Sequence, residues 1–93
     1  MAKPHFGDLC LILWSDPTSD SEWVLSDEES LEPESCVSVG FFYKDTPDYI
    51  SIFGSFNSED IGDRTAIPKA TIRSIRILRR GLYADLRKVR SGE

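Results

Sequence analysis

The first two-thirds of this chain contain almost no basic residues. Residues 1–63 carry fourteen Asp and Glu side chains but only two Lys and no Arg, a local charge of −12. Residues 64–93 carry nine Lys and Arg against two acidic residues, a local charge of +7. The net charge of −5 is therefore the sum of an acidic part and a basic part of the chain. Such an opposition favours head-to-tail association between copies, or mutual neutralisation if the two parts pack together.

Long apolar runs and targeting patterns are also absent. No apolar stretch approaches the roughly 20 residues that a membrane-spanning helix needs. The N-terminus lacks the basic segment and apolar stretch of a secretory signal peptide. We therefore expect a cytoplasmic protein that makes no contact with a membrane.

Cysteine and histidine are too few to build a reactive site. Cys10 and Cys36 lie in apolar runs, where a free thiol behaves as a small buried hydrophobe, and a disulfide between them is the alternative. His5 is the only histidine, and it lies in an N-terminal segment that we expect to be mobile. No histidine is therefore held in position to act as a general base for a Ser or Cys nucleophile. These three side chains also fall short of a zinc site. We expect no catalytic residue, no metal site, no cofactor and no enzymatic activity.

The residues that are present suffice for one domain. The chain has 93 residues, 40% of them hydrophobic, which supports one compact core but not two. We expect a single domain over residues 1–93 with its core over 8–80. The remaining residues, 81–93, form either a frayed basic tail or a short amphipathic helix over 82–90.

Short apolar runs and period-two alternation predict five strands, at residues 9–14, 36–43, 49–56, 64–67 and 74–78. A capping-box pattern at 26–29 predicts a short helix over 27–31. Pro68 predicts a 3-10 turn over 68–71. Gly40 and Gly54, in the middle of two strands, permit sharp bending. These features favour a mostly β fold, a small and strongly bent five-stranded barrel of the Sm-like or SH3-like type.

The same alternation predicts which side chains form the core. Alternate residues of a strand point to the same face of the sheet. The predicted core consists of Leu11, Leu13, Val37, Val39, Phe41, Ile50, Ile52, Ile67, Ile75 and Ile77.

Two patterns in the middle of the chain match known motifs in their spacing. Gly40 is followed after four residues by Asp45 and then by an apolar alternation up to Ile52, and residues 67–75 keep an apolar frame. Over residues 36–78 the chain therefore resembles the Sm-like family. The resemblance implies a small SH3-like barrel that assembles into ring-shaped homo-oligomers.

The chain departs from that family where RNA would bind. Sm-like proteins that hold RNA grip a base with an Asn and an Arg, and this chain has Asp48 and Pro68 at the matching positions. The uridine site that the resemblance would imply is therefore not expected here. The short length, the acidic first half and the run Ile67-Pro68-Lys69 also resemble, loosely, small uncharacterised bacteriophage-borne proteins.

Charged residues near the strand edges are the candidate contacts between copies. An acidic face of one copy would meet basic residues of the next, and this head-to-tail geometry gives a cyclic homo-oligomer. The candidate interface residues are Arg64, Lys69, Arg73, Arg76, Asp45 and Asp48.

The basic C-terminal residues are candidates for weak nucleic-acid contact, because cations bind phosphates and an aromatic ring stacks on bases. They are Arg79, Arg80, Tyr83, Arg87, Lys88 and Arg90. The pI near 4.8 disfavours nucleic acid as the main partner. We expect a non-enzymatic binding or assembly module. The alternatives are a phage-type effector that binds a host protein through its acidic segment in the host cytosol, and an RNA- or nucleotide-binding ring.

Overall fold

A computed structural model describes residues 3–16 and 34–92, with side chains described up to residue 89. Within these residues one antiparallel sheet is followed by a C-terminal helix. The elements are β1 (Leu9–Asp16), β2 (Glu34–Asp45), β3 (Tyr49–Phe56), β4 (Ile61–Pro68), the 3-10 helix η1 (Lys69–Thr71), β5 (Ile72–Arg79) and α1 (Leu82–Gly92).

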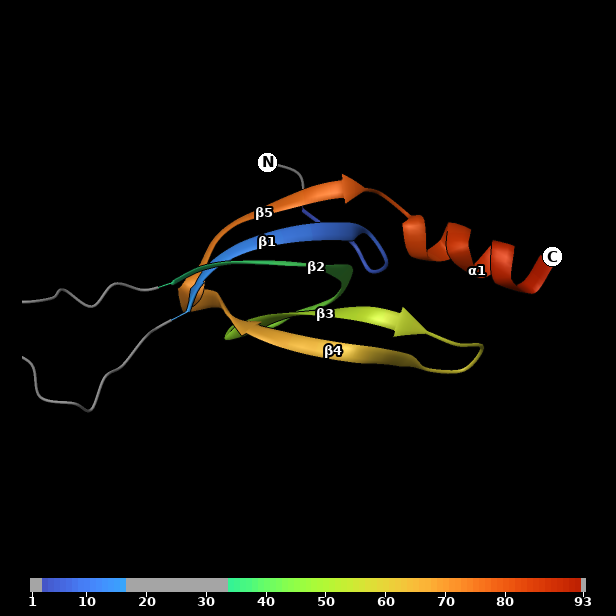
Figure 1. Cartoon of the computed structure of the whole chain (residues 1–93), viewed down its shortest axis with the longest axis horizontal. Helices are drawn as coiled ribbons and strands as arrows, with labels where there is room; N and C mark the ends of the chain where they lie inside the picture. Colours follow the sequence, from blue (N-terminus) through green and yellow to red (C-terminus); the bar gives the residue numbers. More distant parts are fainter. Residues whose placement is uncertain (1–2, 17–33, 93) are drawn as a thin grey trace, which may run out of the picture.

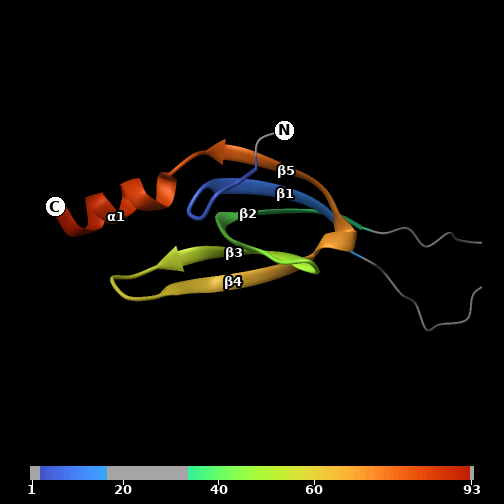
Figure 2. The same ribbon diagram turned by 180° about the vertical axis from the view of Figure 1, so that it is seen from behind.

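The sheet has the order β4-β3-β2-β1-β5 and folds over at β2. β2 curves back on itself, so β5 and β1 lie on one side of the fold and β3 and β4 on the other (Figures 1 and 2). The β2–β3 register is irregular between Phe42 and Lys44, as at a β-bulge, which bends a strand. Gly40 lies close by, where a Cβ atom would come within 3.0 Å of the Phe53 carbonyl oxygen. The expected strong bend is therefore present, and a side chain at residue 40 would obstruct it.

The predicted barrel is not closed in the described part of the chain. β4 pairs with β3, β5 pairs with β1, and no ladder joins β4 to β5. Closure of a barrel requires hydrogen bonds between the first and last strands of the sheet. Because η1 leads the chain from one side of the folded sheet to the other, β4 and β5 remain as two edges (Figure 1).

The predicted elements within the described residues are confirmed. All five strands are present, with every strand except β3 longer than expected, and η1 begins one residue after Pro68. The helical alternative at the C-terminus is correct, since α1 covers 82–92. The helix expected over 27–31 lies outside the described residues. Among the residues described, no helix has the length and apolar character needed to cross a membrane.

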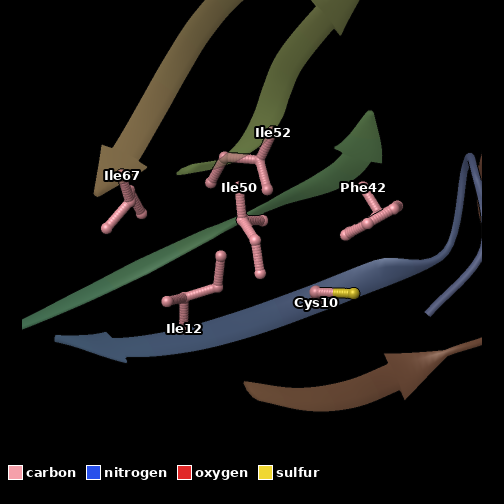
Figure 3. Close-up of a cluster of buried hydrophobic side chains, with 6 residues drawn as sticks. All are labelled: Cys10, Ile12, Phe42, Ile50, Ile52 and Ile67. Carbon is pink, nitrogen blue, oxygen red and sulfur yellow. The ribbon is translucent and has the colours of Figure 1, made fainter. Parts of the chain in front are cut away.

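The main core lies between the two sides of the folded sheet. Six buried side chains form it: Cys10, Ile12, Phe42, Ile50, Ile52 and Ile67 (Figure 3). Trp14, Ile72, Ile75 and Ile77 are partly buried against this cluster. Five of the expected core residues, the isoleucines of β3, β4 and β5, are thus correctly assigned.

The predicted core face of β1 and β2 is wrong. Val37 and Val39 are 60% and 52% exposed, and they pair with Leu13 and Leu11 on the face opposite the core. Ser38 and Gly40 take the inward positions instead. Gly40 belongs there because the bent strand leaves no room for a side chain, and the Ser38 hydroxyl accepts a 3.0 Å hydrogen bond from Trp14 Nε1. Phe41 is buried, but in a different cluster.

Candidate functional site

The buried carboxylate of Asp8 joins the N-terminal segment to the connection between β5 and α1. Asp8 is only 3% exposed. Its Oδ2 atom accepts hydrogen bonds from the His5 backbone N–H and from Arg80 Nη1, each at 2.8 Å, and its Oδ1 atom accepts one from the Gly81 N–H, also at 2.8 Å. The segment that was expected to be mobile is therefore held in place, and Arg80 also donates to the Lys3 carbonyl.

These contacts change the acidity of two side chains. Burial by itself would raise the pKa of the Asp8 carboxyl, but the N–H groups of His5 and Gly81 and the charge of Arg80 hold it below its usual value. Burial, followed by the neighbouring Asp8 charge, raises the pKa of the Cys10 thiol to about 11. Cys10 is therefore a packing residue and not a nucleophile. Both cysteines are free thiols, as expected.

An aromatic cluster anchors α1 to the sheet. It consists of Phe6, Phe41, Tyr43, Phe53, Phe56 and Tyr83. Tyr83 of α1 contacts four of the other rings, with centroids 4.8 to 6.1 Å away. Its backbone N–H also donates to the Gly7 carbonyl at 3.0 Å. Gly7 has a φ of +86°, and a Cβ atom there would lie 3.0 Å from Tyr83 Cβ, so this contact requires glycine.

A groove lies between α1 and the loop that connects β3 to β4. It has a volume of about 500 Å³, and Phe6, Phe56 and Tyr83 contribute aromatic surface to its lining. Arg87 and Lys88 supply its charge, and no acidic residue of the described chain lines it. We call this feature the α1 groove. The part that Phe6 and Phe56 take could not be predicted from the sequence, because they are distant from α1 along the chain and meet it only through tertiary packing.

The structure brings together only some of the residues predicted to contact nucleic acid. Arg80 is engaged with Asp8, and Arg79 forms an ion pair with Asp85 at 3.1 Å. Tyr83, Arg87 and Lys88 do meet, at the α1 groove, where the Arg87 guanidinium lies 5.7 Å from the Tyr83 ring centroid. The side chain of Arg90 lies outside the described part.

The predicted interface residues fall into two groups. Asp45 and Lys69 form an ion pair within the chain, and the Asp48 carbonyl accepts a 2.8 Å hydrogen bond from the Lys69 N–H. These three residues therefore fasten the β2–β3 turn to η1. The remaining residues, Arg64 on β4 and Arg73 and Arg76 on β5, are exposed on the two edge strands.

The described residues hold no cluster of three or more His, Cys, Asp and Glu side chains that could bind a metal ion. The surfaces that remain are the two sheet edges and the α1 groove, and both kinds of surface suit binding to other macromolecules. A comparison with protein-family models found no match, and none was found among curated proteins or solved structures.

Proposed function

We propose that this protein is a non-enzymatic assembly module whose copies form a ring by pairing the β4 edge of one copy with the β5 edge of the next. The open sheet is the observation that carries this proposal. β4 and β5 each have eight residues, and among residues 3–16 and 34–92 each has a strand neighbour on one side only. Edge strands of this length present unpaired backbone N–H and C=O groups, which proteins cover or pair.

The arrangement of the strands supports the assignment of this sheet to the small Sm-like or SH3-like barrels, in an open form. The sheet is strongly bent, it has five strands, and a 3-10 turn precedes the last strand. In a ring, the neighbouring copy would continue the sheet where the single chain leaves it open. The contact is heterologous, so it closes into a ring when the rotation between copies allows.

The charges of the two edges are complementary in an antiparallel pairing. Such a pairing places the beginning of β4 opposite the end of the neighbour's β5. Glu59, Asp60 and Asp63 lie at or just before the beginning of β4, and Arg76 and Arg79 lie near the end of β5. Opposite charges would therefore meet along the contact and fix its direction.

A buried hydroxyl beside β4 also lacks a partner in the single chain. Ser51 is 7% exposed, and its Oγ atom makes no hydrogen bond. It lines a shallow hollow of about 600 Å³ together with residues 61–66 of β4. Buried hydroxyls usually make a hydrogen bond. A polar group of an adjoining copy at this hollow would supply the hydrogen-bond partner that the Ser51 hydroxyl lacks in the single chain.

The test is the mass in solution, measured by sedimentation equilibrium at tens of micromolar. We expect the parent to sediment as a multiple of 10.5 kDa. Arg73→Glu combined with Arg76→Glu should sediment as a monomer with an unchanged circular dichroism spectrum. Val37→Glu, which places a charge on the exposed outer face of the interior strand β2, should keep the parent mass. A monomeric parent would refute the ring and favour an effector that binds a host protein through its acidic segment.

A further inference from the structure

We propose that the α1 groove binds the acidic segment 16–34 of a second copy of this chain, with the apolar run Trp23-Val24-Leu25 against the aromatic lining. This contact is additional to the edge pairing and does not depend on it. Most of the segment lies outside the described residues, and its composition and the positions of its two ends relate it to the groove.

The groove offers an apolar surface that the described residues of its own chain leave uncovered. Phe6 contacts the rings of Tyr43, Phe53 and Tyr83, yet it remains 52% exposed. Phe56 and Tyr83 continue this surface towards α1. Binding pockets in proteins commonly have volumes of about 300–1,000 Å³ and combine an apolar lining with a few polar groups. The α1 groove, at about 500 Å³, meets both conditions.

The charge of the groove selects an anionic occupant. Arg87 and Lys88 line it, and acidic side chains do not contribute to it within the described chain. An occupant that places a carboxylate near Lys88 and an apolar side chain on the rings would match the groove in both respects.

Segment 16–34 has this composition. It contains eight Asp and Glu residues and no Lys or Arg. Its longest apolar run is Trp23-Val24-Leu25, which has Glu22 before it and Asp27 shortly after it. No other part of the chain combines a tryptophan with so many carboxylates, and Trp14, the other tryptophan, packs against the core.

The positions of the segment's ends favour a second copy over the same copy. Asp16 and Glu34 pair with each other at the end of the sheet that is remote from α1 (Figure 1). The seven residues from Asp16 to Trp23 span at most about 25 Å when fully extended. β1 itself covers about 23 Å from Asp16 to Leu9, and the groove lies beyond Leu9. The segment of the same copy would thus need complete extension, whereas that of another copy is not limited in this way.

The first experiment titrates a fluorescently labelled synthetic peptide, with the sequence of residues 16–34, into the full-length protein and follows anisotropy. The receptor carries Arg73→Glu and Arg76→Glu, so that ring formation does not interfere. We expect saturable binding with a dissociation constant on the order of tens of micromolar. Lys88→Glu in the receptor should weaken binding about tenfold, and Lys44→Glu should leave it unchanged.

The peptide variants distinguish this site from general charge attraction. Replacement of Trp23, Val24 and Leu25 by Ser keeps all eight carboxylates and should abolish saturable binding. If this peptide binds as well as the parent peptide, or if Lys88→Glu and Lys44→Glu act alike, the groove is not the site. Absence of binding at 500 µM peptide would also overturn the proposal. Either result leaves the ring untouched, because the ring is tested by mass alone.

The second experiment locates the contact by zero-length carbodiimide cross-linking, which joins a lysine amine to a carboxylate. The chain has four lysines, Lys3, Lys44, Lys69 and Lys88, on different parts of the molecule. We expect mass spectrometry to find the peptide joined to Lys88. Cross-links at Lys44 or Lys69 with none at Lys88 would show that the segment binds elsewhere.

Discussion

At the scale of single residues, the carboxylate of Asp8 connects parts of the chain that are far apart in sequence. It accepts hydrogen bonds from residue 5 and from residues 80 and 81, in a site that excludes most water. Hydrogen bonds to a charged group contribute more than neutral ones, roughly 1.5–3 kcal/mol each. The ionised form of Asp8 is therefore a specific requirement of this fold.

We predict that Asp8→Asn lowers the free energy of unfolding by about 2 kcal/mol at pH 7, because the amide has one acceptor oxygen where the carboxylate has two and loses the charge opposite Arg80. The pKa of Asp8 is lowered in the folded state. Its contribution is thus fully present above the usual aspartate value near 4 and declines as the pH falls below that value. Urea denaturation at pH 7 and pH 3 should show the difference between variant and parent shrinking at the lower pH.

Asp85→Asn is the matched control for this prediction. Asp85 is half-exposed and pairs with Arg79 on the surface, where an ion pair is worth little. We expect this variant to unfold within about 0.5 kcal/mol of the parent at both pH values. A similar loss in both variants would show that the Asp8 site has no special role.

Val39 and Ile12 test which face of the β1–β2 pair is buried. Val39 is 52% exposed, so Val39→Asp should cost less than about 1 kcal/mol. Ile12 is fully buried, and Ile12→Asp should prevent folding because it places an unpaired charge in the core. Thermal melts followed by circular dichroism measure both. If Val39→Asp is unfolded, Val39 faces the core and the predicted alternation of β2 is correct.

At the scale of elements, α1 is attached to the sheet at its first turn, chiefly through the ring of Tyr83. Gly81 separates the helix from β5, and Tyr83 inserts among the rings of the N-terminal segment, β2 and β3. Leu86 and Val89, further along α1, remain exposed. The helix is therefore held at its first turn, and its later turns project from the sheet (Figure 1).

We predict that Tyr83→Ala detaches α1 and costs about 3 kcal/mol, the usual loss for a large aromatic side chain in a packed cluster. Leu86→Ala removes a more exposed side chain of the same helix and should cost less than about 1 kcal/mol. Limited trypsin digestion should cut Tyr83→Ala faster than the parent at Arg87 and Lys88, with Leu86→Ala cleaved like the parent. Equal cleavage of all three proteins would contradict a single anchor.

At the scale of the whole molecule, the acidic and basic parts of the chain meet only partly. Asp8 with Arg80 and Asp45 with Lys69 join the two parts, while the arginines of β4 and β5 stay exposed at the sheet edges. Internal neutralisation therefore accounts for some of the charge. The remainder is distributed in a way that suits contact with another copy.

We predict that single-stranded RNA binds weakly and only through charge. Arg79 and Arg80 are engaged in ion pairs within the chain, so fewer cations reach phosphates than the sequence suggests. Fluorescence anisotropy with oligo-uridine and oligo-adenosine should show equal affinities that fall steeply between 50 and 200 mM salt, as counterion release requires. Tight, salt-resistant binding that prefers uridine would contradict this prediction and support the alternative of an RNA-binding ring.

The local pattern of residues was enough to predict the five strands and the 3-10 turn of this fold, and it left the C-terminal helix as one of two alternatives. Short apolar runs and period-two alternation located the five strands, Pro68 located the 3-10 turn, and the mid-strand Gly40 indicated the bend. These signals are local because backbone geometry and side-chain alternation act over a few residues. The pattern did not locate the Asp8–Arg80 contact, whose partners lie 72 residues apart.

Tertiary packing determined which face of β2 is buried and whether the edge strands β4 and β5 pair with each other. Both faces of β1 and β2 carry apolar side chains, so alternation alone does not select one of them. The bend selects it, because Gly40 must face inward where the strand crosses β3 closely, and this turns Val37 and Val39 outward. The edges stay open for a related reason: whether β4 reaches β5 depends on the curvature of the whole sheet, which no single stretch of residues specifies.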